Sequence, residues 1–329
     1  MRSTVDRVRR AAALGSDVPR GEFPLCVHSV FHAALNFTLP NGEFLTLLSA
    51  EADDLPRSVR LASEEDLLSL GLSPGDGGVF TLDEIVLEPS VGGRRVRVDC
   101  AGAPRLAAQS APPLRGEGKH WRAGVARLEA LQARAATDLR VASLLSEARP
   151  FSAMGERLTQ AAFDLGRGVQ TGRFDAMRGA AARLVGLGPG LTPAGDDFLC
   201  GFFAAGHCRR AGGLACARLL TSLAEAVQDV IGQTTDISAS FLRDALAGRV
   251  SRPLAALAEA CAGAPGSDLG GALLHLAAVG HSSGLDAATG FFYGETVWGR
   301  ATGLAERAPR ASRPTIRLAG RPARAATGG

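Results

Sequence analysis

Hydrophobic and polar positions alternate in two different ways along this chain of 329 residues. From about Gly21 to Leu106, short apolar runs with a period of two are separated by turn sequences, a pattern typical of β-strands. After residue 118, apolar positions recur at helical spacing among Ala, Leu, Arg and Glu. The pattern predicts an α+β protein, with a small N-terminal β-barrel or sandwich-like domain followed by a mainly α-helical domain.

The change of pattern also predicts domain boundaries. We expect an N-terminal extension (1–20), a β-rich domain (21–106), a Pro/Gly-rich linker (107–118), an α-helical domain (119–305) and a disordered basic tail (306–329). Strands are predicted at Phe44–Leu48, Val79–Leu87 and Val96–Val98, with a short helix at Ser63–Ser69. Helices are predicted at His120–Ala148, Ala153–Gly166, Arg173–Leu187, Pro193–Arg210, Leu214–Ile231, Ala239–Ala247, Pro253–Ala262, Asp268–Val279 and Leu285–Ala305.

The segment 186–197, GLGPGLTPAGDD, is the strongest candidate for a functional site. Its alternating glycines permit positive φ angles and let a ligand approach the backbone N–H groups. Thr192 as N-cap and Pro193 as first helical residue predict a helix start, where unpaired N–H groups and the helix dipole favour an anion. The residues predicted to bind this anion are Gly188, Gly190, Leu191, Thr192 and Gly195. The alternative is a tight structural turn with acidic capping residues.

Two adjacent carboxylates, Asp196 and Asp197, follow the glycines and are predicted to be catalytic. They would repel an anion unless a Mg²⁺ ion joined carboxylate and anion, so both are candidate metal ligands. Adjacent helix positions point about 100° apart. We therefore expect one carboxylate to face the loop and the other to order it by hydrogen bonding.

A second glycine-containing segment, 280–286 (GHSSGLD), formally matches G-x-S-x-G. A nucleophile elbow is rejected because the preceding run is helical and no histidine follows His281. We expect instead a polar loop between helices that meets the first glycine loop, with Ser282 or Ser283 capping the next helix. His281 is predicted to be catalytic. The predicted ligand-binding residues are Ser282, Ser283, Gly284 and, from the helix start at 233–238, Thr234 and Thr235, whose hydroxyls either cap or bind.

Composition excludes several classes of protein. The chain has one lysine, Lys119, which lies outside any G-x-x-x-x-G-K-[ST] pattern, so a Walker A loop is absent. The net charge of +3 depends on the tail from residue 306, which has six arginines and one glutamate, and the rest of the chain is slightly acidic. We therefore expect no nucleic-acid or membrane partner. With no secretory signal and no apolar run of membrane length, a cytoplasmic location is expected.

Candidate nucleophiles and metal ligands are few elsewhere. The six cysteines form no C-x-x-C pair and are expected to be buried free thiols. His28, Ser29, His32 and Asn36 in VHSVFHAALNF are interpreted as structural residues. Without a strong nucleophile, direct group transfer by positioning is favoured over a covalent enzyme intermediate.

The motifs GLGPGLTPAGDDFLCG and GHSSGLDAATGF resemble those of the DUF2877 family, which includes a subunit of bacterial oxamate carbamoyltransferase from purine (allantoin) catabolism. The resemblance extends from VHSVFHAALNF to about residue 305. It implies a subunit that acts with two larger partners to convert oxalurate and phosphate to oxamate and carbamoyl phosphate, or the reverse. It assigns no catalytic residues, so the site residues above rest on the physical argument alone.

Three hypotheses of function follow. The first is a subunit of an oxamate carbamoyltransferase-like complex that binds an anionic phosphate or carbamoyl ligand. The second is a self-sufficient Mg²⁺-dependent hydrolase or transferase acting on a phosphate compound. The third is a non-catalytic scaffold subunit, in which the glycine loop makes a protein contact.

Overall fold

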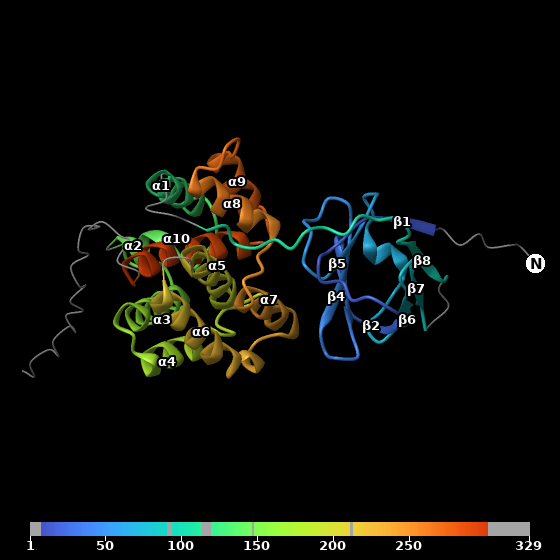
Figure 1. Ribbon diagram of the computed structural model, residues 1–329, viewed down its shortest axis with the longest axis horizontal. Helices are drawn as coiled ribbons and strands as arrows, with labels where there is room; N and C mark the ends of the chain where they lie inside the picture. The colour runs from blue at the N-terminus through green and yellow to red at the C-terminus, as the bar shows by residue number, and fades with distance from the viewer. Residues whose placement is uncertain (1–7, 91–93, 114–119, 147, 211–212, 302–329) are drawn as a thin grey trace, which may run out of the picture.

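A β-barrel and a bundle of helices lie side by side in the computed structural model (Figure 1). The structure describes residues 8–90, 94–113, 120–146, 148–210 and 213–301. The predicted fold class is confirmed, since all eight strands of the barrel precede the helices of the second domain. Lys119 and the tail from residue 306 lie outside the described residues.

The barrel is closed in the order β1-β5-β4-β3-β2-β6-β7-β8. The β1–β8 and β4–β5 pairs are parallel and the others are antiparallel. The strands are β1 (Val8–Leu14), β2 (Phe23–Val30), β3 (Ala34–Thr38), β4 (Phe44–Leu48), β5 (Ser58–Leu61), β6 (Gly77–Phe80), β7 (Glu84–Glu88) and β8 (Val96–Asp99). Alternate side chains such as Leu45 and Leu47 fill the interior.

The predictions for the barrel domain need three corrections, two for strands and one for a helix. β1 begins at Val8, so the barrel starts inside the segment expected to be an extension. The single strand expected at 79–87 is two strands, because the backbone N–H of Thr81 donates to the carbonyl of Glu84 and closes a turn between them. The helix expected at 63–69 is a short 3₁₀ turn, η1 (Leu67–Leu70), capped by the side chain of Asp66.

The second domain is helical throughout its described residues. Its elements are α1 (Trp121–Gln132), α2 (Val141–Leu145), α3 (Ala153–Thr171), α4 (Phe174–Leu184), α5 (Ala194–Arg209), α6 (Leu214–Gln228), η3 (Ile231–Gln233), α7 (Asp236–Leu246), α8 (Arg252–Ala262), α9 (Leu269–Ala277) and α10 (Ser283–Ala301). The long helix expected at 120–148 is divided into α1 and α2. Gln132 holds the turn between them, because its side chain accepts from Val141 N–H and donates to Leu139 C=O.

Helices α5 and α10 form the centre of the helical domain. Glycines allow their backbones to approach closely. A Cβ atom placed on Gly201 would lie 1.8 Å from Ala287 O, and one on Gly290 would lie 1.9 Å from Phe198 O. The phenylalanines of both helices are fully buried around this crossing. The close packing fixes the positions of the two loops that lead into α5 and α10.

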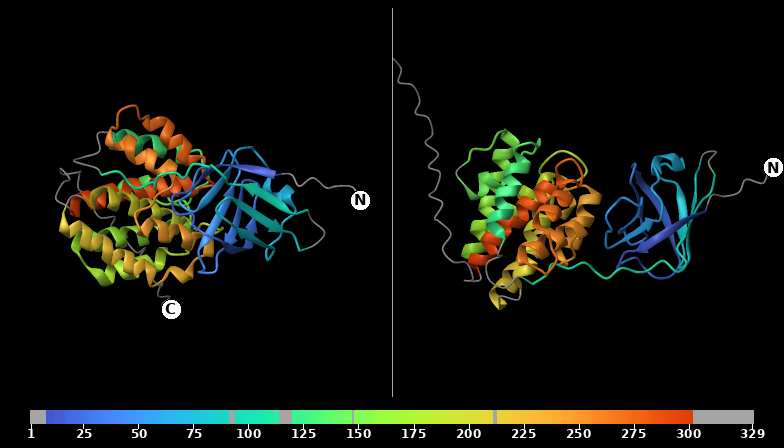
Figure 2. Two further views of the ribbon diagram at one scale, coloured as in Figure 1. Left: turned by 45° about the vertical axis from the view of Figure 1, so that its right-hand side comes forward. Right: turned by 90° about the horizontal axis from the view of Figure 1, so that it is seen from above.

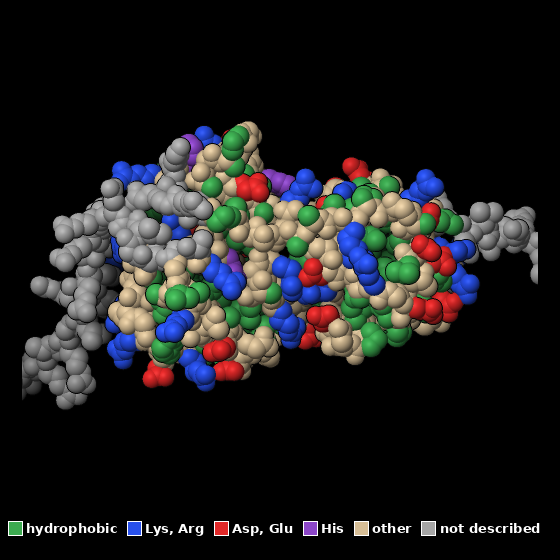
Figure 3. All heavy atoms as spheres, viewed as in Figure 1, with side chains coloured by type: hydrophobic (Ala, Val, Ile, Leu, Met, Phe, Trp, Pro, Cys, Tyr) green, Lys and Arg blue, Asp and Glu red, His purple; other side chains and the backbone are tan. Residues whose placement is uncertain are grey.

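Charged side chains join the two domains (Figure 3). Arg57 of the barrel pairs with Asp244 of α7 at 2.7 Å, and Asp53 lies 3.0 Å from His275 of α9. Arg249 bridges Asp244 and Asp17. The chain segment that connects the domains runs along one side of the junction (Figure 2). Among the described residues, every helix is too short or too polar to cross a bilayer.

Candidate functional site

Three loops that are far apart in the sequence meet at the start of α5. The Thr192 hydroxyl lies 2.8 Å from the Ser283 hydroxyl, which joins the glycine loop to the start of α10. The Thr235 hydroxyl donates to Leu191 C=O at 2.5 Å, which joins the glycine loop to the start of α7. We refer to Thr192, Asp197, Ser283 and Thr235 as the three-loop cluster. The meeting of the two glycine-containing loops agrees with the sequence-based expectation.

The glycine loop has the backbone conformation that its glycines predict. Gly186, Gly188 and Gly190 have φ angles of 73°, 127° and 95°, a region that residues with side chains rarely occupy. Within the described part of the chain, no hydrogen bond uses the N–H groups of Gly188, Gly190, Leu191 or Thr192. Successive unpaired N–H groups in a turn of this kind form a concave surface suited to an anion.

The start of α5 differs from the prediction. The helix begins at Ala194 with Pro193 at the cap position, and no side chain caps it, so Thr192 is not the N-cap. The N–H of Gly195 donates to Leu187 C=O at 2.9 Å, and those of Asp196 and Asp197 donate to Pro193 C=O. The amides of Gly195, Asp196 and Asp197 in the first turn are therefore occupied within the protein.

Gly195 has a structural reason to lack a side chain. A Cβ atom there would lie 2.1 Å from Leu184 O. The contact of Gly195 with a ligand stays a prediction, and its N–H already donates within the protein. Backbone packing against the end of α4 explains this glycine.

Asp196 orders the loops. Its Oδ1 accepts from Gly186 N–H at 2.9 Å, and its Oδ2 accepts from the hydroxyls of Thr234 and Ser238, the latter at 2.7 Å. Its side chain is completely buried. Burial raises the pKa of Asp196, and these three hydrogen bonds oppose that rise by stabilising the charged form. Asp196 thus ties the glycine loop to α7, which is the ordering role expected for one of the two carboxylates.

Asp197, a member of the three-loop cluster, has one carboxyl oxygen without a hydrogen-bond partner. The hydroxyls of Ser283 and Thr192, which bond to each other, lie near its carboxyl group and favour its charged form, whereas its Oδ2 is buried and has no hydrogen-bond partner. The residue is 9% exposed. Burial raises the pKa of Asp197 well above its usual range, and the neighbouring carboxyls of Asp286 and Asp196 raise it further. A buried acceptor without a donor is costly, so Asp197 is the strongest candidate to contact a ligand.

Asp286, on the first turn of α10, is a site residue that the sequence analysis missed. It is 1% exposed, its Oδ1 accepts from the Thr137 hydroxyl at 3.1 Å, and its Oδ2 is unpaired. Burial raises the pKa of Asp286 to about 7, against hydrogen bonds from Ser282 and Thr137. The segment GLD offered a signal in its acidic residue, but Thr137 lies 149 positions away in the sequence.

Three further residues predicted for the site, Ser282, His281 and Gly284, lie outside the three-loop cluster. Ser282 precedes α10, and its C=O accepts from the N–H of Asp286 at 2.9 Å. His281 is exposed and makes no hydrogen bond or ion pair within the described residues. The N–H of Gly284 donates to Val279 C=O, and a Cβ atom there would lie 1.7 Å from Leu276 O. Gly284 therefore serves the packing of α10 on α9, and its contact with a ligand stays a prediction.

The arrangement of the carboxylates does not fit a Mg²⁺ ion held by Asp196 and Asp197. Both oxygens of Asp196 already accept hydrogen bonds. Nowhere in the described ranges do three or more His, Cys, Asp or Glu residues group as a metal site. The structure thus supplies one available carboxylate oxygen per residue, at Asp197 and Asp286, rather than a ligand set.

Thiol chemistry finds no support at this site. All six cysteines are free, and four of them are buried as expected, whereas Cys26 is exposed and Cys200 is partly buried. Burial raises the pKa of Cys200 well above its usual range, as do the nearby carboxyls of Asp197 and Asp196. A thiol of this kind stays protonated and is a poor nucleophile.

The fold and the site define a two-domain α+β protein, in which a closed barrel precedes a helical domain with buried acids at its loops. Residues 184–295 match the family model described as oxamate carbamoyltransferase subunit AllH, and residues 3–105 match the AllH family N-terminal domain. The chain belongs to the AllH family. No curated protein and no solved structure matches it.

Proposed function

We propose that this chain is a subunit of an oxamate carbamoyltransferase-type assembly. The assembly would interconvert oxalurate plus phosphate with oxamate plus carbamoyl phosphate. Membership of the AllH family supports a role as a subunit, since the family is named for a subunit of that enzyme. The small anionic substrate and the other subunits of the complex are the proposed partners.

Within that assembly, the three-loop cluster binds a small anion that carries a carbamoyl or amide group. The observation that carries this proposal is the unpaired, buried Oδ2 of Asp197 beside the hydroxyls of Thr192 and Ser283. A carboxylate oxygen accepts from an amide N–H, and hydroxyls donate to a carbonyl or carboxylate oxygen. Oxamate and oxalurate carry both kinds of group on adjacent carbons.

The glycine loop supplies the donors for the anionic end. The unpaired N–H groups of Gly188, Gly190 and Leu191 lie on the same loop as Thr192. An anion there sits near Asp197, whose raised pKa makes its neutral form more accessible. The repulsion that suggested a bridging Mg²⁺ ion is reduced when Asp197 is protonated. Proton exchange at this oxygen then accompanies binding.

The chain's own contribution to the reaction is positioning. The N–H groups of the glycine loop hold the anionic end of the ligand, and Asp197 holds or accepts a proton at Oδ2 beside its carbamoyl or amide group. The two loops are fixed by the close crossing of α5 and α10. The rest of the active site comes from the partner subunits, so the isolated chain binds ligand but turns it over slowly.

Co-expression with the partner subunits tests this proposal. We expect the chain to co-purify with them, and the complex to form carbamoyl phosphate from oxalurate and phosphate far faster than the chain alone. Full turnover by the isolated chain would contradict the role as a subunit and favour a self-sufficient enzyme. An assembled complex whose turnover is unchanged by Asp197→Asn would favour a scaffold role.

A further inference from the structure

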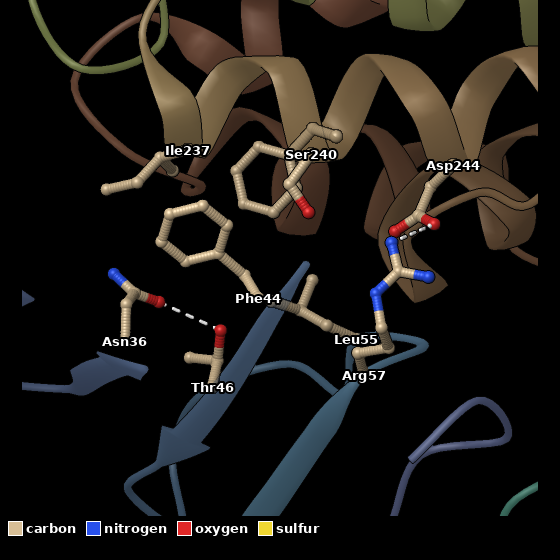
Figure 4. A pocket seen from close by; sticks show the side chains of 9 residues that line it. Asn36, Phe44, Thr46, Leu55, Arg57, Ile237, Ser240 and Asp244 are labelled. Carbon is tan, nitrogen blue, oxygen red and sulfur yellow. Dashed lines mark hydrogen bonds and ion pairs between the residues drawn. The ribbon is translucent and has the colours of Figure 1, made fainter. Parts of the chain in front are cut away.

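We propose that the barrel positions the three-loop cluster through Arg57, which holds α7 by its Asp244. The contact lies where the barrel faces α7 (Figure 4). Arg57 acts as a positioning residue, because it reaches the cluster through α7 rather than by touching a ligand. This inference deepens the proposed function, and its consequence for ligand binding rests on that function.

The first turn of α7 holds the loops of the site. The Thr235 hydroxyl donates to Leu191 C=O at 2.5 Å, and the Ser238 hydroxyl donates to Asp196 Oδ2 at 2.7 Å. The other carboxyl oxygen of Asp196 accepts from Gly186 N–H at 2.9 Å. A movement of α7 therefore acts on the glycine loop at both of its ends.

The last turn of α7 is held by the barrel. Asp244 Oδ1 accepts from Arg57 Nη2 at 2.7 Å, and from Nε and Nη2 of Arg249 at 3.1 and 3.0 Å. The backbone of Arg57 is itself fixed to β4, since its C=O accepts from the N–H of Thr46 at 3.0 Å. The side chains of Arg57 and Asp244 are only 9% and 11% exposed. The barrel thus ends in a rigid, buried contact with α7.

The Arg57–Asp244 pair fixes a position more than it adds stability. Desolvation offsets much of the attraction between buried charges. The Nε–H of Arg57 is also buried without a hydrogen-bond partner, which is a further cost. Burial raises the pKa of Asp244, and the charges of Arg57 and Arg249 oppose that rise. When Arg57 is lost, Asp244 turns to Arg249 or takes up a proton, and either change releases α7 from the barrel.

Helix α7 connects its two ends as a short rod. It has 11 residues, which corresponds to a length of about 16 Å. A second contact from the barrel, between His28 Nε2 and Asp236 at 3.7 Å, is weak, because the Asp236 side chain is 78% exposed. Among the described residues, Arg57 is therefore the strongest ion-pair partner that the barrel supplies to α7.

Amide hydrogen exchange of the full chain, followed by NMR, tests the proposal with the variant Arg57→Met. The N–H groups of Gly186 and Ser238 report on the contact, because they donate to Asp196 and Thr235. We expect both to exchange at least about fivefold faster in the variant. Exchange within α3 should stay unchanged, because the variant loosens α7 and not the whole domain.

Two further variants complete this experiment. Arg57→Lys keeps the charge, so it should accelerate exchange less than Arg57→Met, and it carries the test if Arg57→Met does not fold. Arg252→Met is the matched control. Arg252 lies at the same domain junction, 3.6 Å from Asp54 with its side chain 62% exposed, and precedes α8 rather than α7 in its contacts. It should leave exchange at Gly186 and Ser238 unchanged.

Calorimetric titration of oxamate into the complex with the partner subunits measures the consequence for binding. Arg57→Met should weaken oxamate about fivefold or more, and Arg252→Met should not. A wild-type complex that does not bind oxamate would contradict the proposed function. Selective exchange at Gly186 and Ser238 in Arg57→Met would still support the positioning role in that case.

Four results would overturn the proposal. The first is equal exchange at Gly186 and Ser238 in wild type and the Arg57 variants. The second is faster exchange throughout, α3 included, which would show a general loss of stability. The third is an equal acceleration in Arg252→Met. The fourth is an unchanged oxamate affinity in Arg57→Met despite faster exchange, which would break the link between Arg57 and binding.

Discussion

The barrel and the helical domain treat their buried acids differently. In the barrel, Asp76 accepts three hydrogen bonds from Ser73 and Ser90, and Asp54 pairs with Arg60 at 2.8 Å. In the helical domain, Asp197 and Asp286 each keep a buried oxygen without a partner. A protein retains such groups where a ligand or a proton transfer uses them, since folding alone gains nothing from them. The comparison supports the proposal that the ligand site lies at the loops of the helical domain rather than in the barrel.

The crossing of α5 and α10 should be the most sensitive point of the helical domain. Gly201→Ala places a methyl group 1.8 Å from Ala287 O, so the helices must separate. We expect the free energy of unfolding to fall by about 3 kcal/mol or more, measured by denaturant unfolding.

Gly179→Ala, on α4, is the matched control. A Cβ atom at this position meets nothing within 4 Å. Alanine there should raise stability by up to about 1 kcal/mol, as in an ordinary helix. Similar losses in both variants would show that the close crossing does not carry the effect.

Variants of the two adjacent carboxylates should distinguish the residue that orders the loops, Asp196, from the residue proposed to bind the ligand, Asp197. In wild type, both oxygens of Asp196 accept hydrogen bonds from the protein. Asp196→Asn replaces one of these oxygens with an N–H₂ group, which then faces another donor. We therefore expect the free energy of unfolding to fall by about 2 kcal/mol. Asp197→Asn removes a buried carboxylate with an unpaired oxygen, so stability should stay equal or rise. Equal destabilisation of the two variants would remove the distinction between them.

Stability should depend on pH through Asp286. Its pKa is raised to about 7 by burial, so between an ordinary carboxyl pKa of about 4 and that value the native state holds a proton that the unfolded state has released. The free energy of unfolding therefore falls as pH rises through this window, by up to about 1.4 kcal/mol per pH unit. Asp286→Asn should reduce the slope, as measured by urea unfolding between about pH 4 and about pH 8. Glu295, whose pKa burial also raises to about 7, keeps its own contribution. An unchanged slope would contradict the buried proton.

Loss of an exposed ion pair at the edge of the domain junction should have the smallest effect on stability among these variants. Arg252 lies 3.6 Å from Asp54 with its side chain 62% exposed, and Asp54 keeps Arg60 when Arg252 is removed. We expect Arg252→Ala to cost less than about 1 kcal/mol in thermal unfolding. A loss several times larger would mean that the Arg252–Asp54 pair, rather than the Arg57–Asp244 pair, holds the domains together.

Local patterns in the sequence were sufficient for much of the fold. The strand Phe44–Leu48 was predicted at its observed bounds, because its apolar run follows a turn sequence. All five of its residues are buried, since one face fills the barrel and the other faces α7. The glycine loop was also found from the sequence, because positive φ angles and a helix start leave local signals.

The details that failed depend on contacts between distant segments. The cap at Thr192 was wrong because its hydroxyl instead meets Ser283, 91 positions later. The close packing of Gly195 and Gly284 against the backbones of neighbouring elements was also not foreseen. Asp286 and the Arg57–Asp244 pair were missed because their partners lie 149 and 187 positions away in the sequence. Such juxtapositions are set by tertiary packing, which spacing along one sequence does not encode.

Calorimetric titration of oxamate into the wild-type chain and its Asp197→Asn variant, each assembled with its partner subunits, tests the central claim most directly. Asparagine keeps the shape but cannot exchange a proton, and it replaces one of the two carboxyl oxygens with an N–H₂ group, so the account predicts at least about a tenfold weaker affinity. Asp236→Asn, at an exposed position at the start of α7, should bind oxamate as wild type does. Equal affinity for oxamate in wild type and Asp197→Asn would contradict the account.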